Sequence, residues 1–314
     1  MMTDYANKQV VVVGAGRSGL GLARFFRSRG ALVTLSDQRQ AGELSGLEPL
    51  AESGVVFDLG GHDTQLFANA DLLALSPGVP LEIDAIRGAR AKGVPVEGEV
   101  EIAWCELQAP LIGITGTNGK STVTSLIGAM LNRWGKRTFV GGNLGTPLIE
   151  AVGQQWDWLV VELSSFQLEA IVRLRPRYGL LLNISSDHLD RYPDMASYRS
   201  AKCRIFENMG PGETAILNAD DPQVVEVASE ISARIVWFSS NRVPDQGVGL
   251  EGGDLVWRWQ GQDARFPVDQ LQLAGIHNLE NVMAAMVPLL LEGCPPDIAW
   301  SAVRDFRGVP HRME

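Results

Sequence analysis

The sequence predicts an α/β protein built from two domains, residues 1–97 and residues 98–314. Apolar, strand-like runs alternate with helical stretches along the whole chain, which is the pattern of strand–helix units stacked on a parallel sheet. A length of 314 residues suits two compact domains better than one small one. Two glycine-rich loops, beginning at Gly14 and Gly113, each follow an apolar run, and each opens its own strand–helix series.

The first series combines three apolar runs with two stretches of helical spacing. We expect strands over 10–13, 32–36 and 70–75, and helices over 18–28 and 83–92. A short apolar and acidic segment over 96–104 leads from this series into the second one.

The second series is longer and ends in a different pattern. Strands are expected over 111–115, 138–140, 158–162 and 180–184, and helices over 120–134, 279–291 and 296–306. Polar and apolar residues alternate over 248–259 and 264–273, which indicates a small β-hairpin or ribbon. We therefore expect a mostly parallel sheet with a short antiparallel addition.

The charge balance excludes one class of partner. The chain has 27 Lys and Arg against 37 Asp and Glu, which gives a net charge of -10. Proteins that follow a phosphate backbone carry a basic face, so no nucleic acid is expected as a partner. Any anionic ligand must be held by local devices, such as backbone amides and a few fixed cations.

The cysteines and the apolar runs indicate a cytoplasmic protein. Cys105, Cys203 and Cys294 lie far apart and form no CxxC pair, which argues against a disulfide framework or a zinc site. Residues 1–9 are polar and lack the apolar centre of a signal peptide. The apolar runs are too short to span a bilayer, so no membrane insertion is expected.

The first glycine loop, over residues 14–19, is a full G-x-G-x-x-G between an expected strand and an expected helix. Its glycines let the backbone turn tightly and approach a pyrophosphate at the positive end of the helix. Asp37 ends the next strand, where dinucleotide enzymes often place a carboxylate that meets a ribose hydroxyl. Three interpretations of this loop stay open: it binds NAD, it binds another diphosphate such as a UDP group, or it is a turn that only packs the helix on the strand. The motif does not distinguish the two ligands, because it recognises phosphates and not the base.

The second glycine loop, over residues 113–122 (GITGTNGKST), indicates ATP binding. Glycines free backbone N–H groups to cradle phosphates, Lys120 can reach the terminal phosphate oxygens, and the Ser121 hydroxyl can ligate Mg²⁺. Ile114 stands where the standard motif has its first glycine. A purely structural turn is the alternative, but the apolar strand before the loop and the helix after it favour a nucleoside triphosphate.

Two residues after this loop, Glu162 and His188, are candidates for a metal site. Glu162 ends an apolar strand, as a Walker-B-type acid would, although a solvated charge at a strand end is the alternative. His188 follows another apolar strand, where a structural role and a ligand role are equally compatible with the pattern. Lys202 is, from the pattern alone, a lysine on the surface of a helix.

Several motifs together resemble one family, the Mur ligases, and most closely its D-glutamate-adding branch. The matching pieces, in chain order from the loop at Gly14 to Arg312, are Ser76-Pro77-Gly78, residues 116–122, residues 141–145, residues 162–169, residues 187–192, residues 275–278 and Pro310-His311-Arg312. They cover nearly the whole chain. The stretch ELSSFQLE over 162–169 looks specific to the D-glutamate-adding branch.

The resemblance implies a Rossmann-like first domain that binds a UDP-sugar and a P-loop-type central domain that binds ATP and Mg²⁺. ATP would phosphorylate the carboxylate of UDP-N-acetylmuramoyl-L-alanine, and the amine of D-glutamate would attack the acyl phosphate to form an amide in peptidoglycan synthesis. The UDP-sugar site would comprise Gly14, Gly16, Arg17, Ser18, Asp37, Gln38, Ser76, Gly78, Asn143, Ser164 and Gln167. Gln38 stands where the family has threonine.

The resemblance also implies the residues of the ATP and metal sites. Nucleotide contacts would come from Gly116, Thr117, Asn118, Gly119, Lys120, Ser121, Thr122, Asn281 and Arg312. Ser121 and Glu162 would hold one Mg²⁺ and His188 a second. Lys202 matches the family's carbamylated lysine, whose added CO₂ turns a cation into a metal-binding anion. Lys120, Glu162, His188 and Lys202 would be the catalytic set of a monomeric enzyme.

The family has a third domain, which closes over ATP and binds the incoming amino acid. The present sequence stops at Glu314, two residues beyond Arg312, so we expect this form to be inactive alone. Three other interpretations stay open. They are another ligase of the same superfamily, such as a later Mur ligase or a folylpolyglutamate synthase, an NAD-dependent oxidoreductase with an NTP-binding module, and a non-catalytic nucleotide-binding regulator.

Overall fold

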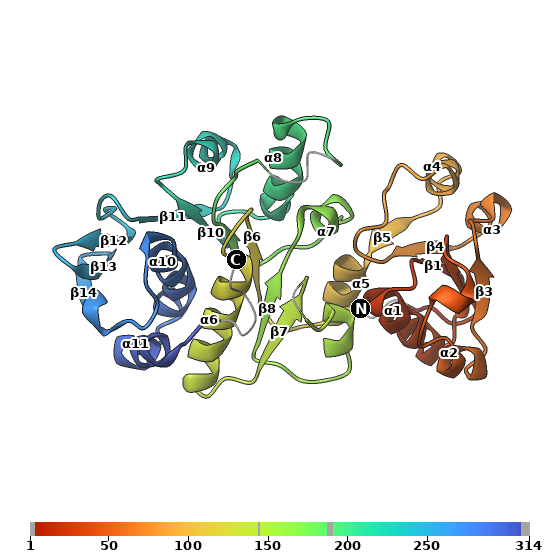
Figure 1. Ribbon diagram of the computed structural model, residues 1–314, viewed down its shortest axis with the longest axis horizontal. Helices are drawn as coiled ribbons and strands as arrows, with labels where there is room; N and C mark the ends of the chain where they lie inside the picture. The colour runs from red at the N-terminus through yellow and green to blue at the C-terminus, as the bar shows by residue number, and fades with distance from the viewer. Residues whose placement is uncertain (1–3, 144, 187–190, 309–314) are drawn as a thin grey trace. The chain divides into compact units, whose positions relative to one another are not determined.

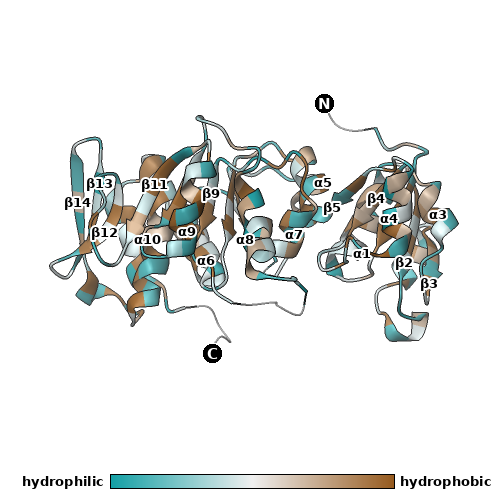
Figure 2. Ribbon diagram, turned by 90° about the horizontal axis from the view of Figure 1, so that it is seen from above, coloured by the Kyte–Doolittle hydropathy of each residue, from teal (hydrophilic) through white to brown (hydrophobic). Residues whose placement is uncertain are grey.

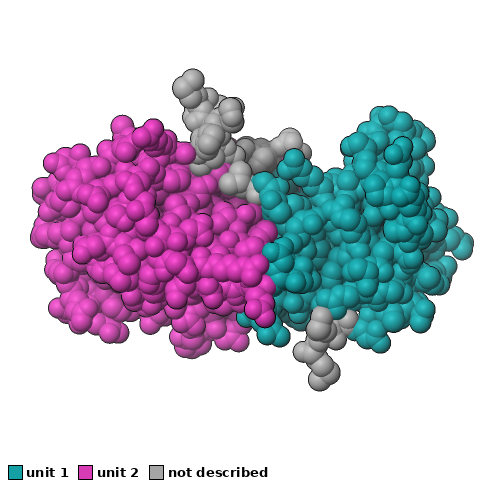
Figure 3. Space-filling view, turned by 90° about the horizontal axis from the view of Figure 1, so that it is seen from below, with its two compact units in different colours: residues 1–108, 145–154, 166–174 teal, residues 109–144, 155–165, 175–314 magenta. Residues whose placement is uncertain are grey.

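The chain forms two compact units, which the computed structural model describes over residues 4–143, 145–186 and 191–308 (Figures 1 and 3). Unit 1 comprises residues 1–108, 145–154 and 166–174, and unit 2 comprises residues 109–144, 155–165 and 175–314. The chain thus returns twice to unit 1 after the first segment of unit 2. The α/β fold class expected from the sequence is confirmed, whereas the first segment of unit 1 ends at residue 108 and not at residue 97.

Unit 1 is built on a five-stranded parallel sheet in the order β3-β2-β1-β4-β5. The strands are β1 (Gln9–Val13), β2 (Leu32–Asp37), β3 (Val56–Leu59), β4 (Leu72–Leu75) and β5 (Val96–Gly98). The order changes direction between β1 and β4. In open parallel sheets, ligands bind outside the carboxyl ends of the strands at such a point.

Short connections and five helices surround this sheet (Figure 1). The helices are α1 (Arg17–Ser28), α2 (Glu48–Glu52), α3 (Thr64–Ala68), α4 (Asp84–Ala91) and α5 (Glu99–Glu106), and a 3₁₀ turn covers Ala41–Glu43. The inner face of α1 buries Leu22 and Phe26 completely, and Phe26 meets Tyr5 edge to face with ring centroids 4.9 Å apart. Amphipathic packing of this kind is the main stabilisation of helices on a sheet.

Two buried carboxylates of α5 hold the segments with which the chain returns to unit 1. Glu101 accepts hydrogen bonds from the backbone N–H groups of three consecutive residues, Val172, Arg173 and Leu174, at 2.9–3.0 Å. Glu99 accepts the N–H of Ile149, in the 3₁₀ turn Leu148–Ala151, at 2.7 Å. The sequence predicted neither α5 nor these contacts, because a helix with buried acids lacks the amphipathic pattern that identifies surface helices.

Unit 2 is built on a nine-stranded sheet in the order β14-β13-β12-β11-β10-β9-β6-β8-β7. The strands are β6 (Leu111–Thr115), β7 (Thr138–Gly142), β8 (Trp158–Glu162), β9 (Tyr178–Leu181), β10 (Thr214–Asn218), β11 (Arg234–Ser239), β12 (Gly247–Glu251), β13 (Asp254–Trp259) and β14 (Gln262–Pro267). The sheet is parallel from β7 to β12, and β12, β13 and β14 form an antiparallel meander. The expected ribbon is thus confirmed as the edge of the main sheet.

Helices on unit 2 pack against an extensive apolar core. They are α6 (Lys120–Arg133), α8 (Met195–Cys203), α9 (Pro222–Val227), α10 (Ile276–Leu291) and α11 (Pro296–Asp305), with 3₁₀ turns at Arg204–Phe206, Ala228–Glu230 and Val268–Gln270. Helix α7 (Ser165–Glu169) follows β8, and all of it except Ser165 belongs to unit 1. Val282 and Met286 of α10 and Leu126 of α6 are fully buried in this core. Strands such as β11 are correspondingly brown in Figure 2.

The predicted elements differ from the observed ones mainly at their ends. Strand β9 covers Tyr178–Leu181, whereas the apolar run predicted a strand over 180–184. Apolar residues continue to Ile184, which is buried although it lies beyond the strand. None of the described helices combines the length and the apolar character needed to cross a membrane.

We predict that Glu99 makes the stability of the protein depend on pH. Burial raises its pKa from 4.5 to about 7. The contribution of protonated Glu99 to the free energy of unfolding is therefore complete below pH 4.5 and is lost as the pH rises through 7. Since one pKa unit corresponds to about 1.4 kcal/mol, ionised Glu99 destabilises the folded state by roughly 3 kcal/mol. Urea unfolding of Glu99→Gln should show a free energy of unfolding that changes less between pH 5.5 and pH 8.5 than that of the parent.

The exposed Glu52 of α2 provides the matched control. Glu52→Gln should keep the pH dependence of the parent. An equal loss of stability between the two pH values in Glu99→Gln and in the parent would contradict the role of Glu99.

Candidate functional site

The first glycine loop of unit 1 is held by the end of the neighbouring strand. Gly14 follows β1 with a φ of +92°, a conformation that favours glycine, and its N–H donates to the carbonyl of Ser36 at 2.8 Å. The N–H of Ala15 donates to Oδ2 of Asp37 at 2.7 Å. A Cβ at Gly19 would lie 1.8 Å from the carbonyl oxygen of Gly14, so the third glycine is required for the close packing of α1 on the loop.

Asp37 is buried and already accepts several hydrogen bonds from the protein. Besides Ala15, its carboxylate binds the backbone N–H of Arg39 at 2.9 Å and the Arg39 guanidinium at 2.8–3.0 Å. The Arg39 side chain is the largest contribution that lowers the pKa of Asp37 far below its ordinary value, and the bond from Ala15 adds to it. Asp37 therefore fixes the glycine loop as a permanent anion.

A cavity of about 320 Å³ lies at the carboxyl ends of β1, β2 and β4. Its lining includes six residues of the predicted UDP-sugar set, namely Gly14, Gly16, Asp37, Gln38, Ser76 and Gly78. Arg17 and Ser18 lie in the first turn of α1 outside this lining, and Nη1 of Arg17 donates to the carbonyl of Gly145 at 3.3 Å. Gly16 is the N-cap of α1 and supplies no side chain, so the first N–H groups of the helix are not capped by it.

Two further residues of the predicted UDP-sugar site, Gln167 and Ser164, lie outside the lining of this cavity. Gln167 is buried and lines a cavity of about 10 Å³, the size of one water molecule, together with Ser76 and Glu99. Ser164 lies between β8 and α7 and is half-buried.

The second glycine loop connects β6 to α6 in unit 2. Gly116 and Gly119 have φ values of +149° and +86°. Nζ of Lys120 turns back to the loop and donates to the carbonyls of Gly116 at 3.0 Å and Thr117 at 2.8 Å. Ser121 and Thr122 follow in the first turn of α6. The loop is therefore closed around the charged end of Lys120.

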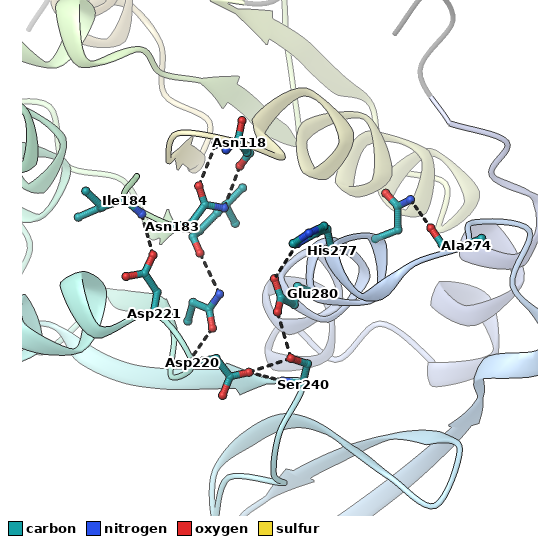
Figure 4. A network of polar contacts seen from close by, with 12 residues as sticks. Asn118, Asn183, Ile184, Asp220, Asp221, Ser240, Ala274, His277 and Glu280 are labelled. Atoms are coloured by element: carbon teal, nitrogen blue, oxygen red, sulfur yellow. Dashed lines mark hydrogen bonds and ion pairs between the residues drawn. The ribbon is translucent and has the colours of Figure 1, made fainter. Parts of the chain in front are cut away.

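Asn183, which the sequence analysis did not select, fixes the tip of this loop. Its side chain accepts the N–H of Asn118 at 2.8 Å and donates to the carbonyl of the same residue at 3.1 Å (Figure 4). Thr117 is fixed in a similar way, because its hydroxyl exchanges hydrogen bonds with the backbone of Ser185 at 3.0 and 3.2 Å. Asn183 was missed because it lay inside the strand predicted over 180–184.

Glu162, at the end of β8, brings together two other predicted residues. It is 1% exposed, and its two carboxylate oxygens accept hydrogen bonds from the Ser121 hydroxyl at 2.7 Å and from the Asn143 amide at 2.8 Å. This set offers the hard oxygen donors that Mg²⁺ prefers. Within the described ranges, no three His, Cys, Asp or Glu side chains gather as a metal site.

Lys202 corrects one expectation from the sequence pattern. It is not a surface lysine of α8, because only 2% of it is exposed. Its Nζ donates to the carbonyl of Gly116 at 2.8 Å and lies 4.5 Å from the centre of the Tyr198 ring. Lys202 therefore lies at the phosphate loop, as the family resemblance implies. His188 and Arg312 lie outside the described residues.

A larger cavity, of about 750 Å³, lies beside the phosphate loop within unit 2, and Figure 4 labels several residues of its lining, such as Asn118 and Glu280. Asn118, Gly119 and the predicted Asn281 line it. A Cβ at Gly119 would lie 2.2 Å from Oδ1 of Asn281, so α10 and the loop are in close contact.

An acidic network forms another part of this cavity. Burial alone would raise the pKa of Asp220, but hydrogen bonds from Ser239 and Ser240 outweigh it and lower that pKa. The Ser240 hydroxyl also contacts Glu280 of α10 at 3.0 Å. The sequence analysis selected none of these residues, because no motif marks them.

Each of the two units matches a model of the same protein family. A model described as "Mur ligase MurD-like, N-terminal domain" matches residues 8–98, and one described as "Mur ligase middle domain" matches residues 114–289. The chain belongs to the Mur ligase family. The chain is 58% identical to a UDP-N-acetylmuramoylalanine–D-glutamate ligase of Syntrophotalea carbinolica over 99% of its own length and 70% of that protein.

Another relative and two solved structures are also similar to this chain. The corresponding ligase of Geotalea uraniireducens is 46% identical over 99% of this chain and 69% of that protein. Among solved structures, a Neisseria ligase for UDP-N-acetylmuramate and L-alanyl-γ-D-glutamyl-meso-diaminopimelate aligns with a TM-score of 0.65 at 19% identity, covering 97% of this chain and 99% of that one. A type C pseudomurein peptide ligase of Methanothermus fervidus aligns at 0.58 and 24% identity, covering 98% and 72%. These similarities confirm the fold of both units.

We predict that two glycine-to-alanine substitutions in unit 1 change the free energy of unfolding in opposite directions. Gly19→Ala forces a methyl group onto the Gly14 carbonyl and should lower the free energy of unfolding by about 2 kcal/mol or more. Gly88 lies inside α4, where an added Cβ meets nothing within 4 Å, so Gly88→Ala should raise it by about 0.5–1 kcal/mol. Chemical unfolding of both variants measures the difference. Equal stability of Gly19→Ala and the parent would refute the packing role of this glycine.

Proposed function

We propose that this Mur ligase adds D-glutamate to UDP-N-acetylmuramoyl-L-alanine with ATP, in peptidoglycan synthesis. The main support is the identity of 58% to a UDP-N-acetylmuramoylalanine–D-glutamate ligase, together with two glycine loops on two separate sheets. One loop without a lysine suits a diphosphate ligand, and one with Lys120 suits a triphosphate. A ligase that consumes ATP and a UDP-sugar needs both.

The residues of the second loop would bind and orient ATP. Backbone N–H groups over 116–122 would cradle its phosphates, and Lys120 would place a positive charge at the terminal phosphate. The carboxylate of the UDP-sugar attacks the γ-phosphorus, ADP leaves, and an acyl phosphate is formed. The amine of D-glutamate then attacks the acyl carbon, and phosphate leaves as the amide bond forms.

Ser121 and Glu162 would hold Mg²⁺, which supplies charge neutralisation at the phosphates. The hydrogen bond of 2.7 Å between these residues supports this proposal, because one ion would be within reach of both oxygens. His188 would bind a second ion, and Arg312 and Asn281 would contact the nucleotide, as the family resemblance implies. The cavity lined by Asn281 beside the loop supports this assignment for the base.

Lys202 would carry a carbamate when the enzyme is active. A neutral lysine amine adds CO₂ and releases one proton, which converts a cation into an anion. The support is the position of Nζ, buried and 2.8 Å from the Gly116 carbonyl of the phosphate loop. An unmodified ammonium group at that place would repel Mg²⁺, whereas a carbamate would attract it.

The cavity of unit 1 would bind the uridine diphosphate group, with its phosphates at the glycine loop and the N-terminus of α1. Gly14, Gly16, Asp37, Gln38, Ser76 and Gly78 line it, Arg17 and Ser18 begin the helix, and Asn143, Ser164 and Gln167 would contact the sugar part. Asp37 would act mainly by holding the loop, because its carboxylate already binds Ala15 and Arg39. We propose that the enzyme acts in the cytoplasm as a monomer.

Direct titration distinguishes this function from the NAD-dependent alternative that the first loop also fits. By calorimetry, the 314-residue chain should bind UDP-N-acetylmuramoyl-L-alanine at the first loop and should show no heat with NAD⁺. Gly88→Ala, outside both loops, should bind the UDP-sugar as the parent does. Binding of NAD⁺ in preference to the UDP-sugar would overturn the proposed function.

A further inference from the structure

His62 is part of a hydrogen-bonded chain at the cavity of unit 1 that the proposed function does not use. The hydroxyl oxygen of the fully buried Ser36, on β2, lies 2.8 Å from Oδ2 of Asp58 and 2.8 Å from Nδ1 of His62. Ser36 and Asp58 are paired across β2 and β3. Oδ2 of Asp58 also accepts the backbone N–H of Asp63 at 3.1 Å.

This arrangement determines which nitrogen of neutral His62 carries the proton. An ionised carboxylate only accepts hydrogen bonds, so the contact with Asp58 requires Ser36 to donate its single hydrogen there. Ser36 can then only accept from His62, and Nδ1 must carry the hydrogen. Nε2 of the neutral ring is therefore a hydrogen-bond acceptor.

His62 belongs to the lining of the cavity. His62 lines it together with Val79, Pro80 and Ile83, which offer apolar contact for a flat ring. The imidazole is fixed from the side by the buried Phe67, whose ring centre lies 5.4 Å away. Nε2 points away from Ser36, and no described residue forms a hydrogen bond with it.

We propose that Nε2 of His62 accepts the N3–H group of uracil and thereby selects uridine over cytidine nucleotides. This inference rests on the proposed function, which assigns the diphosphate to the glycine loop of the same cavity. Uracil presents a donor at N3, whereas cytosine presents a lone pair there. With cytosine in the same position, the lone pair of N3 would face the lone pair of Nε2, and neither atom would have a hydrogen-bond partner. Unpaired polar atoms of this kind are the most effective basis for rejecting a close analogue.

The test compares three nucleotides that differ only at the base. UDP, CDP and 3-methyl-UDP, in which a methyl group replaces the N3 hydrogen, are titrated into the protein by calorimetry. The parent should bind UDP at least about tenfold more tightly than the other two, as expected for one lost hydrogen bond with unpaired partners. In His62→Phe, which keeps an aromatic ring beside Phe67, the UDP affinity should fall about tenfold and the preference over CDP should nearly vanish.

Two variants at Asp58 separate a specific role of the hydrogen-bonded chain from a general loss of structure. Asp58→Asn keeps an acceptor oxygen for Ser36 and Asp63 and should keep the preference for UDP. Asp58→Ala frees the Ser36 hydrogen to donate to Nδ1, so Nε2 can become a donor, and the preference should fall although His62 is intact. Circular dichroism of each variant checks that the fold is unchanged.

The outcomes distinguish this proposal from the function on which it rests. If the parent binds UDP but His62→Phe or Asp58→Ala keeps the full preference over CDP, the role of His62 is wrong and the UDP-sugar site stands. If the parent binds 3-methyl-UDP as tightly as UDP, no acceptor reads N3 and the proposal is also wrong. If the parent binds none of the three nucleotides, the assignment of the cavity itself fails.

Discussion

The buried amine of Lys202 contacts the backbone of the phosphate loop and thereby joins α8 to that loop. Removing an ammonium group from water is costly unless the protein replaces the lost hydrogen bonds. The Gly116 carbonyl at 2.8 Å and the face of Tyr198 provide part of that replacement. Lys120 bonds the same carbonyl at 3.0 Å, so two positive charges meet at one end of the loop. Before CO₂ is added to Lys202, these two amines favour an anionic ligand, whereas in the proposed carbamate form Lys120 supplies the positive charge and Lys202 attracts Mg²⁺.

Both units fix a glycine loop with an acid from the neighbouring parallel strand. In unit 1, Asp37 at the end of β2 binds the Ala15 amide in the loop that follows β1. In unit 2, Glu162 at the end of β8 binds Ser121, just after the loop that follows β6. Parallel strands end at one edge, so a strand-end carboxylate is within reach of the next loop without any long connection. The acids therefore organise the binding loops as well as offering charge to a ligand.

Local pattern was enough to predict the α/β fold, the two glycine loops and the position of Glu162 at the end of a strand, because apolar runs and glycine spacing are properties of adjacent residues. The burial of Lys202 was not predictable in this way, since it results from the packing of α8 against a loop 86 residues earlier in the chain. The hydrogen-bonded chain from Ser36 to His62 was missed for the same reason, whereas Asn183 was missed because it lay inside the strand predicted over 180–184. Helix α5 was missed because Glu99 and Glu101 are buried, and a pattern analysis treats acids as exposed.

The role of Lys202 in the phosphate site can be measured directly by ¹³C NMR with ¹³C-labelled bicarbonate, Mg²⁺ and ATP. The chain has five lysines, at positions 8, 92, 120, 136 and 202, so few carbamate signals can arise. We expect one protein-bound carbamate signal that Lys202→Arg loses and that Lys136→Arg, as the matched control, keeps. Thermal unfolding of both variants checks their fold. A signal that persists in Lys202→Arg, or no signal at all in the parent, would contradict the account.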